Sequence, residues 1–444
     1  MHAVPLDKLR AIVGPASVLS GVELSPYVIE GRTPEAAVFP GSLEEVRGVV
    51  DLAAGAEIPI VAWGGGTAAA VGTPTAPVRL GIVLGLARMN RLVEHEPGDL
   101  TATAEAGTPF ATLQTALRTH GQWLSLDPPD PARATLGGVM VANASGPRRH
   151  LYGTARDLVI GMTIVTAEGA VVRAGGKVVK NVAGYDLPKL FVGSYGTLGI
   201  VVDVTVKLRP LPEDERLVCA RFDRLKDAAT AARAVMASDL IPNAIELLDA
   251  EAARTLEPLA ANPGATLVVG FDGLREQVDW QCAELATLVH PLGAAAVQPL
   301  PAQTWTRLAP AAPGACGGAP AALMRLSVLP AQVGDVMEQV VVAARSRSLH
   351  CACTAHAGVG VVTAALFSSR EQQELGPVAA TLSDWRGVAR SGGGHAVLDW
   401  APLAVKSEIP VWDDAGAAGR IMQRIKTQLD PQNLLNPGRF VAGI

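Results

Sequence analysis

Two glycine-rich stretches carry the clearest chemical signal in the sequence. The first, Gly64-Gly65-Gly66-Thr67, follows the apolar run Ile58–Val61 and is expected to form a loop where a strand ends. Glycine lacks a Cβ atom and reaches positive φ, which allows successive backbone N–H groups to converge on one anion. The second stretch is Thr135-Leu136-Gly137-Gly138. Because the chain contains 46 glycines, ordinary turns are the alternative interpretation of both stretches.

A pair of arginines offers a second kind of anion chemistry. Arg148 and Arg149 follow Ser145-Gly146-Pro147. A guanidinium group can hold a carboxylate through two parallel hydrogen bonds. Arginines that lie on the surface or dock a partner are an equally good interpretation.

The cysteines do not suggest a metal or iron–sulfur site. The chain has five, and only Cys351 and Cys353 lie close together in sequence. A Cys-x-Cys pair lacks the spacing of zinc or iron–sulfur ligands. We therefore expect reduced structural thiols, typical of a cytoplasmic protein, and no metal held by this chain.

Length and charge narrow the class of protein. A chain of 444 residues predicts two or three domains. The net charge of −5 argues against a nucleic-acid partner, which usually requires a basic face. No apolar run approaches the roughly 20 residues that span a bilayer. The first ten residues also lack the pattern of a signal peptide, so we expect a cytoplasmic location.

The elements around the first glycine stretch are a helix and a strand. Ser42 with Glu45 three residues later forms a capping box, and a helix is expected from there to Gly55. A strand over Ile58–Val61 then leads into the glycines. The glycine loop of a Rossmann fold opens a helix, whereas small residues without an apolar stripe follow Thr67, so a Rossmann fold is disfavoured.

Short strands dominate the chain up to residue 212. The patterns predict strands over 79–84, 92–95, 100–106 and 201–208, and a hairpin from 162–173 around Glu168-Gly169. Thr108 as N-cap and Pro109 as first helical residue predict a helix ending before Gly121. Residues 139–144 form a helix or a strand. Pro210 and Pro212 mark a domain boundary.

Helices and strands alternate differently after residue 213. Helices are expected over 221–239, 277–289, 331–344, 370–385 and 415–429, and strands over 266–271, 323–328 and 363–367. Residues 299–320 are rich in Pro, Ala and Gly and are expected to form a loop. This order fits two helices packed on an antiparallel sheet, an α+β arrangement.

Four motifs together resemble a known family. They are Gly64–Thr67, Thr135–Gly138, Gly196-Thr197-Leu198-Gly199-Ile200 and Asn436-Pro437-Gly438-Arg439. The set is similar to the FAD-binding domain of the vanillyl-alcohol oxidase type, also called the PCMH type. Ser145–Arg149, Arg156-Asp157 and Lys180–Asp186 bring the chain closer to the FAD-binding subunits of bacterial glycolate oxidases of the GlcE type. The resemblance is dense over about 40–210 and 411–444.

The resemblance implies an α+β fold with three parts. A two-subdomain FAD-binding PCMH-type domain would span 1–211, and an α+β cap or substrate domain would span 212–410. The C-terminal segment 411–444, with its helix, would return to pack on the FAD domain.

The resemblance also implies which residues hold a non-covalent FAD. Backbone amides at the first glycine loop would meet the pyrophosphate, and the second stretch would form the opposite wall. Ile200 and its neighbours would meet the adenine, and Asn436 the flavin edge. Covalent attachment is not expected, because residues 61–72 contain no His or Cys. The implied cofactor residues are Gly64, Gly65, Gly66, Thr67, Gly72, Pro128, Pro129, Thr135, Gly137, Gly138, Ala142, Ser145, Gly146, Gly199, Ile200 and Asn436.

The chain departs from its single-chain relatives at a metal-binding motif. Where they carry His-x-Gly-Asp-Gly-Asn-x-His, this chain has His356-Ala-Gly-Val-Gly-Val-Val-Thr363. One histidine cannot hold a divalent ion, so the resemblance implies no metal here. His395 stands where a second family motif places a histidine, without its neighbouring Glu. His356 and His395 are candidate bases near the flavin, and packed or surface histidines are the alternative.

The function implied is that of a subunit in a glycolate oxidase-like complex. A second FAD-binding subunit would oxidise a small 2-hydroxy acid to a 2-oxo acid, and an iron–sulfur subunit would receive the electrons. Peripheral attachment to the inner face of a membrane would come through these partners. The alternatives are a stand-alone FAD-dependent 2-hydroxy-acid dehydrogenase and an accessory subunit whose FAD is purely structural.

Overall fold

The computed structural model describes residues 3–73, 80–177, 185–256, 259, 264–368 and 375–444. The chain divides into two compact units. The first unit comprises Met1–Ser145, Thr154–Leu211 and Asp414–Ile444, and the second comprises Gly146–Gly153 and Pro212–Asp413. Arg79, the first residue of an expected strand, and most of the Lys180–Asp186 motif lie outside the described residues.

The division differs from the expected domains at residues 146–153 and at residues 411–413, which were expected in the C-terminal segment but belong to the second unit. Residues Gly146–Gly153 were expected in the FAD-binding domain but belong to the second unit. Their side chains explain why, because Arg148 and Tyr152 bind Glu215 and Asp272 of that unit. A short polar segment of this kind gives no sequence signal for the partner on which it packs.

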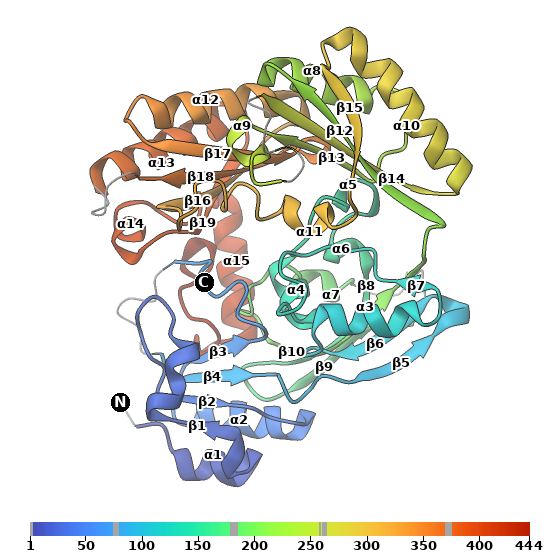
Figure 1. Ribbon diagram of the computed structural model, residues 1–444. Helices are drawn as coiled ribbons and strands as arrows, with labels where there is room; N and C mark the ends of the chain where they lie inside the picture. Colours follow the sequence, from blue (N-terminus) through green and yellow to red (C-terminus); the bar gives the residue numbers. More distant parts are fainter. Residues whose placement is uncertain (1–2, 74–79, 178–184, 257–258, 260–263, 369–374) are drawn as a thin grey trace. The chain divides into compact units, whose positions relative to one another are not determined.

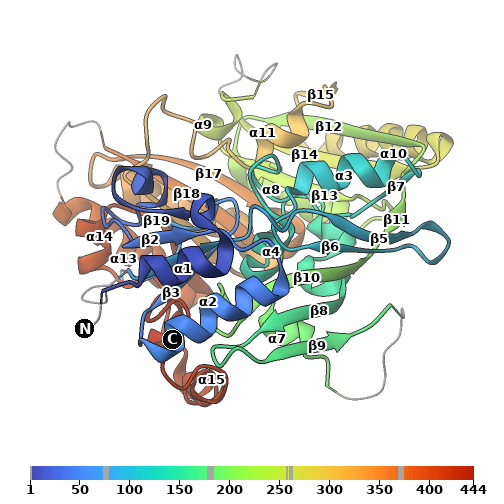
Figure 2. The ribbon, with the colours of Figure 1, turned by 90° about the horizontal axis from the view of Figure 1, so that it is seen from below.

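The first unit contains two main sheets. One has the order β1-β2-β4-β3, in which β2, β3 and β4 are parallel, and the other has the antiparallel order β5-β6-β10-β8-β9. Figure 2 shows α1 and α2 alongside the first of these sheets. The strands are β1 (Val18–Leu19), β2 (Ala36–Val38), β3 (Ile60–Trp63), β4 (Ile82–Gly85), β5 (Leu92–Glu96), β6 (Thr101–Glu105), β7 (Gln122–Trp123), β8 (Val159–Val165), β9 (Val171–Gly175), β10 (Ile200–Lys207) and β11 (Arg209–Pro210).

Most helices of the first unit are short and amphipathic. They are α1 (Leu6–Val13), α2 (Leu43–Gly55), α3 (Phe110–Arg118), α4 (Leu136–Ala142), α6 (Ala155–Leu158), α7 (Pro188–Phe191) and α15 (Gly416–Leu429). The buried residues of α2, Val46, Val49, Val50 and Ala53, lie at helical spacing and join the core between helix and sheet.

Local signals set several helix starts. The Ser42 side chain accepts a hydrogen bond from the Glu45 N–H, as the capping box predicts. The Glu45 carboxylate accepts a hydrogen bond of 2.7 Å from the Gly41 N–H and not from the N-cap Ser42 N–H that a capping box would use. The prediction for α3 was wrong by one residue: Pro109, not Thr108, holds the N-cap position, and the helix begins at Phe110. The alternative left open for 139–144 is resolved as α4, with Asn143 in the left-handed conformation after it.

The second unit is built on one eight-stranded antiparallel sheet (Figure 1). The strand order is β15-β12-β14-β13-β17-β18-β16-β19. The strands are β12 (Asp214–Phe222), β13 (Ala244–Leu248), β14 (Ala265–Gly273), β15 (Ala296–Leu300), β16 (Ala322–Ser327), β17 (His350–His356), β18 (Val361–Phe367) and β19 (His395–Trp400). The helices are α5 (Arg149–Tyr152), α8 (Leu225–Met236), α9 (Ala250–Ala253), α10 (Arg275–Val289), α11 (Thr304–Leu308), α12 (Val333–Arg345), α13 (Leu375–Ser391) and α14 (Leu403–Glu408).

The two faces of this sheet pack against different helices. Ile245, Leu247 and their neighbours on one face share a core with α8, α10, α12 and α13. Ala244 and Leu248, which alternate with them, lie in a separate core with α9 and α11. We call the second face the distal face. Because side chains alternate along a strand, Glu246 and His356 belong to the distal face.

Three predictions in this unit needed correction. The helix expected from Arg221 begins at Leu225, because Asp214–Phe222 forms β12. The loop expected over 299–320 contains the end of β15 and the helix α11. Strands β13 and β17 were missed because both of their faces pack and the apolar alternation is lost, and the edge strand β19 was missed as well.

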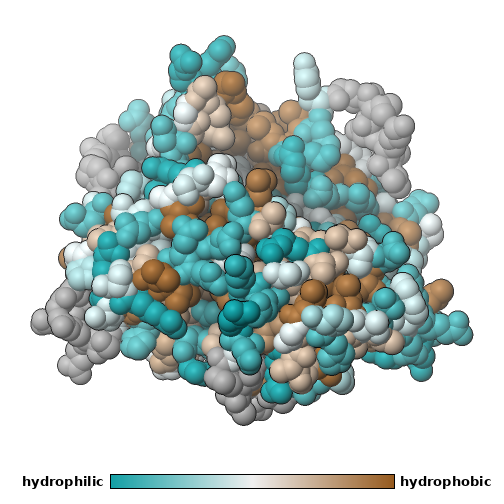
Figure 3. Space-filling model, turned by 90° about the horizontal axis from the view of Figure 1, so that it is seen from above, coloured by the Kyte–Doolittle hydropathy of each residue, from teal (hydrophilic) through white to brown (hydrophobic). Residues whose placement is uncertain are grey.

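One face of the molecule is drawn by hydropathy in Figure 3. Hydrophobic groups there are interspersed among hydrophilic ones. Scattered exposed apolar side chains, such as Leu274 and Trp280, are ordinary on a folded protein. Within the described part of the chain, no helix has the length and apolar character to cross a bilayer.

Candidate functional site

A cavity in the first unit lies where β3 ends. It is lined by seven residues that the sequence singled out and by others that it did not. The predicted ones are Gly64, Gly65, Gly66, Thr67, Gly138, Ala142 and Asn436. The structure therefore brings three of the four motifs, separated by up to 375 positions in sequence, to one cavity.

The first glycine loop packs directly on the segment before α4. A Cβ atom added to Gly65 would lie 1.6 Å from the backbone oxygen of Arg133, and one added to Gly64 would lie 2.2 Å from Thr135 Oγ1. Gly66 has φ of +72°, which disfavours other residues there. The glycines are thus required by close approach and by backbone conformation.

The same loop presents unused backbone donors. Within the described chain, no acceptor is found for the N–H groups of Gly65, Gly66 and Thr67. Consecutive free N–H groups at a glycine-rich turn are a common way of binding a phosphate or another anion.

The residues of the second glycine-rich stretch, Thr135, Gly137 and Gly138, have different structural roles. The Thr135 hydroxyl caps α4 by accepting a hydrogen bond from the Gly138 N–H. Gly137 packs against Ala106, the residue after β6, whose Cβ would lie 2.6 Å from a Cβ added to Gly137. Gly138 alone of these three lines the cavity. Gly72 has φ of +128° and lies against Arg439, which closes the first loop.

The other predicted cofactor residues lie away from the lining of the cavity. Pro128 is buried and Pro129 is exposed. Gly199 packs against Ile164, and the Ile200 side chain is part of the hydrophobic core. Ser145 is the last residue before the chain enters the second unit, and Gly146 belongs to that unit.

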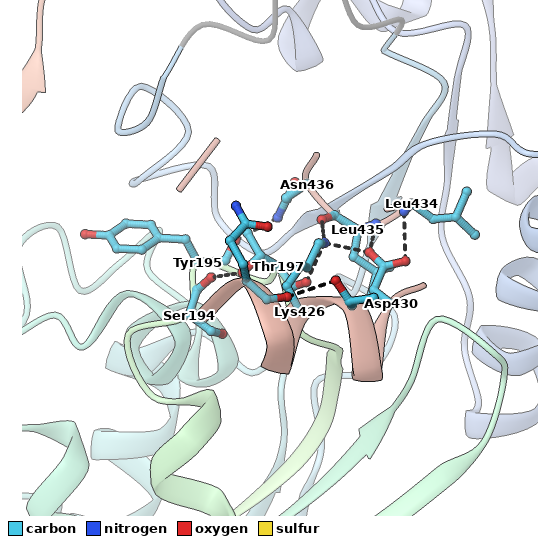
Figure 4. A network of polar contacts seen from close by, with 10 residues as sticks. Ser194, Tyr195, Thr197, Lys426, Asp430, Leu434, Leu435 and Asn436 are labelled. Carbon is cyan, nitrogen blue, oxygen red and sulfur yellow. Dashed lines mark hydrogen bonds and ion pairs between the residues drawn. The ribbon is translucent and has the colours of Figure 1, made fainter. Parts of the chain in front are cut away.

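A dense set of polar contacts anchors the C-terminal segment that contributes Asn436 to the cavity wall (Figure 4). The Lys426 ammonium group donates to Asp430 at 2.6 Å, to the Thr197 carbonyl at 2.8 Å and to the Leu435 carbonyl at 2.9 Å. Asp430 also accepts hydrogen bonds from the N–H groups of Leu434 and Leu435. Burial lowers the pKa of Lys426, and the Asp430 carboxylate opposes that shift.

Asn436 and Arg439 extend these contacts to the cavity wall. The Asn436 amide donates to the Tyr195 carbonyl at 2.7 Å, and Arg439 donates to the carbonyls of Ala69 and Val71. Asn436 and Tyr195 both have positive φ, 44° and 52°. Non-glycine residues in this conformation are strained and concentrate at functional sites.

The residues present fit FAD. A cavity walled by glycines and small side chains admits close backbone approach, and its loop offers the free N–H groups that a pyrophosphate requires. Asn436 Oδ1 is buried and, among the described groups, has no hydrogen-bond partner, which leaves a polar atom at the wall. The N–H groups suit the anionic part of such a cofactor, and the polar atom of Asn436 suits a neutral polar part.

Several lining residues were missed by sequence reasoning. They are Ile29, Val61, Ala62, Trp63, Ala68, Ala69, Val71, Val141, Tyr195 and Arg439. Arg439 stands in the quoted Asn436–Arg439 motif and was the one with a usable signal. Burial lowers its pKa.

In the second unit, His356 is bound to a buried glutamate. Its Nδ1 lies 2.8 Å from both carboxylate oxygens of Glu246, which is directly opposite on β13. The Glu246 side chain is 4% exposed and that of His356 is 18% exposed. A carboxylate at Nδ1 holds the proton there and leaves Nε2 as the nitrogen that can accept one.

The second candidate histidine lies elsewhere on the sheet. His356 pairs with Val361, Val361 with Ser327, and Ser327 with His395. The two histidines therefore share a face but are three strand spacings apart, roughly 14 Å. His395 is exposed, so the structure does not join the two histidines in one site.

Arg148 does hold a carboxylate, and the carboxylate belongs to this chain. Its guanidinium makes two bonds, of 2.8 and 2.7 Å, to Glu215 and stacks 3.8 Å from the ring centre of Trp305. Asn243 and Tyr152 complete the cluster by binding Asp272. Arg148 is thus explained by internal packing on the distal face.

His150, two residues on, supports the turn that follows His356. A Cβ atom on Gly358 would lie 2.2 Å from the His150 ring. Burial lowers the pKa of His150, so its ring is neutral at neutral pH. Among the described side chains, no cluster of three His, Cys, Asp or Glu is arranged to hold a metal ion.

Comparison with known proteins identifies two adjoining family regions. Residues 34–175 match the FAD binding domain, and residues 211–397 and 412–440 match the C-terminal domain of FAD linked oxidases. The chain is 30% identical over 424 residues to glycolate oxidase subunit GlcD of Bacillus subtilis, covering 92% of this chain and 89% of that protein. The chain belongs to the FAD-linked oxidase family.

This FAD-linked oxidase has further relatives of two kinds. It is 41% identical over 156 residues to glycolate oxidase subunit GlcE of Escherichia coli, covering 35% of this chain and 43% of that subunit. It is 37% identical over 221 residues to the mitochondrial cytochrome-type D-lactate dehydrogenase 1 of Saccharomyces cerevisiae, covering 49% and 37% of the two chains. The family is that of FAD-dependent oxidoreductases, with FAD as the cofactor.

The fold of the oxidase agrees with solved structures of the PCMH type. Substrate-bound p-cresol methylhydroxylase superposes with a TM-score of 0.76 at 20% identity, over 99% of this chain and 96% of that one. At this identity the likeness concerns the fold alone. It confirms the expected α+β fold of the PCMH type.

Proposed function

We propose that this FAD-linked oxidase oxidises a small 2-hydroxy acid to the 2-oxo acid as a subunit of a glycolate oxidase-like complex. An iron–sulfur subunit would take the electrons, and a second FAD-binding subunit would complete the assembly. The observation that carries the proposal is the match to a glycolate oxidase subunit over nearly the whole of both chains.

The His356–Glu246 pair supports a catalytic role for this chain. Oxidation of a 2-hydroxy acid removes the hydroxyl proton and, from C2, a hydrogen with two electrons. His356 Nε2 is suited to accept the hydroxyl proton, because Glu246 fixes the tautomer and stabilises the imidazolium that forms. When bound, FAD supplies the acceptor for the two electrons and the C2 hydrogen.

The first unit would bind the cofactor through backbone groups. Gly65, Gly66 and Thr67 are the proposed donors to the pyrophosphate, while Gly138, Tyr195 and Asn436 form the facing walls. These residues bind and orient, and no proton transfer is assigned to them.

Anaerobic reduction of the bound flavin tests the activity. The FAD-loaded chain is mixed with glycolate or D-lactate, and the loss of visible flavin absorbance is followed in time. We expect bleaching by at least one 2-hydroxy acid. His356→Gln should slow bleaching about 100-fold or more, the range of a lost general base.

Three variants sharpen the result. Glu246→Gln should also slow bleaching, because Nδ1 loses its charged partner. His290→Gln, on an exposed histidine of the same unit, is the matched control and should leave the rate unchanged. A large loss in His395→Gln with normal rates in His356→Gln would overturn the assignment of the base.

A stand-alone FAD-dependent 2-hydroxy-acid dehydrogenase is the second candidate, supported by the D-lactate dehydrogenase relative. Both candidates predict bleaching, and they differ in electron transfer. A subunit should pass electrons to a co-purified iron–sulfur partner faster than to a soluble quinone analogue. If no 2-hydroxy acid reduces the flavin, either in the isolated chain or in the reconstituted complex, both candidates fail and the FAD has a structural role only.

A further inference from the structure

We propose that Lys426 is a positioning residue for FAD. Its ammonium group ties the turn that carries Tyr195 to the segment that carries Asn436, and so sets the shape of one cavity wall. This inference depends on cofactor binding only and not on the proposed substrate.

The geometry makes Lys426 the common point of three segments. It donates to the Thr197 carbonyl, two residues beyond Tyr195, and to the Leu435 carbonyl, next to Asn436. Its third contact, Asp430, accepts from the N–H groups of Leu434 and Leu435. All three Lys426 bonds are buried, and the Lys426 side chain is 5% exposed.

The two lining residues require such support. Tyr195 and Asn436 both hold positive φ and are joined by the hydrogen bond from the Asn436 amide to the Tyr195 carbonyl. Strained conformations persist only where the surroundings enforce them. Without the ammonium group, the Thr197 and Leu435 carbonyls lose a donor, and both neighbours can relax out of the cavity-forming conformation.

Burial also argues that Lys426 has a specific task. A buried ammonium group pays a desolvation penalty that a packed apolar side chain avoids. Lys426 meets that penalty with three short bonds to groups that flank the cavity wall. Arg424, two residues earlier on the same helix, is by contrast exposed.

The test is the affinity of the full-length apo-protein for FAD. The dissociation constant is measured by titration of flavin fluorescence, at a temperature where circular dichroism shows each apo-variant to be folded. Lys426→Met should raise the dissociation constant at least tenfold. Lys426→Gln, which keeps a donor, should raise it less, and Arg424→Met is the matched control with an unchanged constant.

A double-mutant cycle separates positioning from general destabilisation. If Lys426 acts through the wall, Lys426→Met combined with Asn436→Leu should bind FAD within about threefold of the weaker single variant. The visible spectrum of bound FAD should shift in the same way in both single variants.

Two results would overturn the inference. One is an unchanged dissociation constant in folded Lys426→Met. The other is a double variant in which the two losses multiply, since independent effects on FAD binding add in free energy. If Lys426→Met does not fold, Lys426→Gln and Asp430→Asn replace it, and each is combined with Asn436→Leu in the same double-mutant cycle of FAD affinity.

Discussion

At the scale of single residues, the cavity requires glycine at positions where a Cβ atom would clash with neighbouring groups. Gly64 and Gly65 lie against Thr135 and Arg133, and neither can carry a side chain without moving backbone or a capping hydroxyl. The sequence showed the glycines but not the residues on which they pack. These neighbours become visible only in the folded chain, where the loop after β3 packs on the segment before α4.

Gly65→Ala tests this contact. The new Cβ would lie 1.6 Å from the Arg133 carbonyl oxygen, so we expect the variant to lose about 1–3 kcal/mol of unfolding free energy and most of its bound FAD. Urea denaturation and the flavin content of the purified protein measure the two effects.

Gly55→Ala is the matched control for that substitution. Gly55 lies in α2 with open space around its Cβ position, so alanine should stabilise the chain by about 0.5–1 kcal/mol. Equal stability of the two variants would contradict a packing requirement at Gly65.

Residues that act through a partner were the hardest to predict. His356 was named from a motif, whereas Glu246 lies in the apolar run Ala244–Leu248, and nothing in that run marks it as functional. Only the pairing of β13 with β17 sets the two opposite each other. Arg148 shows the converse: its bidentate chemistry was foreseen, but its partner, Glu215, is 67 positions away.

At the scale of elements, Asp413 holds the edge of the eight-stranded sheet. Its carboxylate accepts from the Ala396 N–H at the start of β19 and binds Arg386 and Arg390 of α13. Burial raises the pKa of Asp413, but the hydrogen bonds from Ala396 and the arginines outweigh burial, and the pKa lies below its ordinary value of 3.8.

The pH dependence of stability follows from that shift. A carboxyl group whose pKa is lower in the folded state stabilises the fold above its unfolded pKa, and the stabilisation is lost as the pH falls through the folded pKa. We therefore expect Asp413→Asn to lose about 2 kcal/mol at pH 7 and the difference from wild type to shrink below pH 3.8.

Urea denaturation between pH 3 and pH 7 measures this difference. Asp384→Asn is the control, because Asp384 pairs with Arg347 while about half exposed and should change stability by less than about 0.5 kcal/mol. A gap between wild type and Asp413→Asn that stays constant with pH would contradict the role given to its charge.

Elements were predictable where apolar and polar residues recur in sequence with the period of the element. The capping box and apolar spacing of α2 and the alternation of β10 gave both elements close to their true bounds. Strands β12, β13 and β17 failed that approach because helices cover one face and the α9–α11 core covers the other. With both faces apolar, period and composition no longer separate a strand from a helix.

At the scale of the whole molecule, the chain passes between its two units four times, near residues 145, 153, 211 and 413. The boundary prolines at 210 and 212 gave a sequence signal for one of these passages. The return at 413 was implied by the resemblance, and the excursion of Gly146–Gly153 was not foreseen. The cavity proposed to bind FAD is therefore lined by segments from both sides of the second unit in sequence.

Binding of FAD should stabilise the chain as a whole. A ligand at 100 times its dissociation constant adds about 2.7 kcal/mol to the unfolding free energy when it binds the folded state alone. We expect the midpoint of thermal unfolding to rise steadily with FAD concentration. Riboflavin, which lacks the pyrophosphate, should produce a smaller rise at equal concentration, and an equal rise would contradict a role for the glycine loop in phosphate binding.

The wall formed by Asn436 and Arg439 also sets an order of events during biosynthesis. Ribosomes make the glycine loop some 370 residues before they make this wall. If both walls are needed to hold FAD, as proposed, we expect the cofactor to be retained only after the segment from Lys426 to Arg439 has been synthesised and has folded.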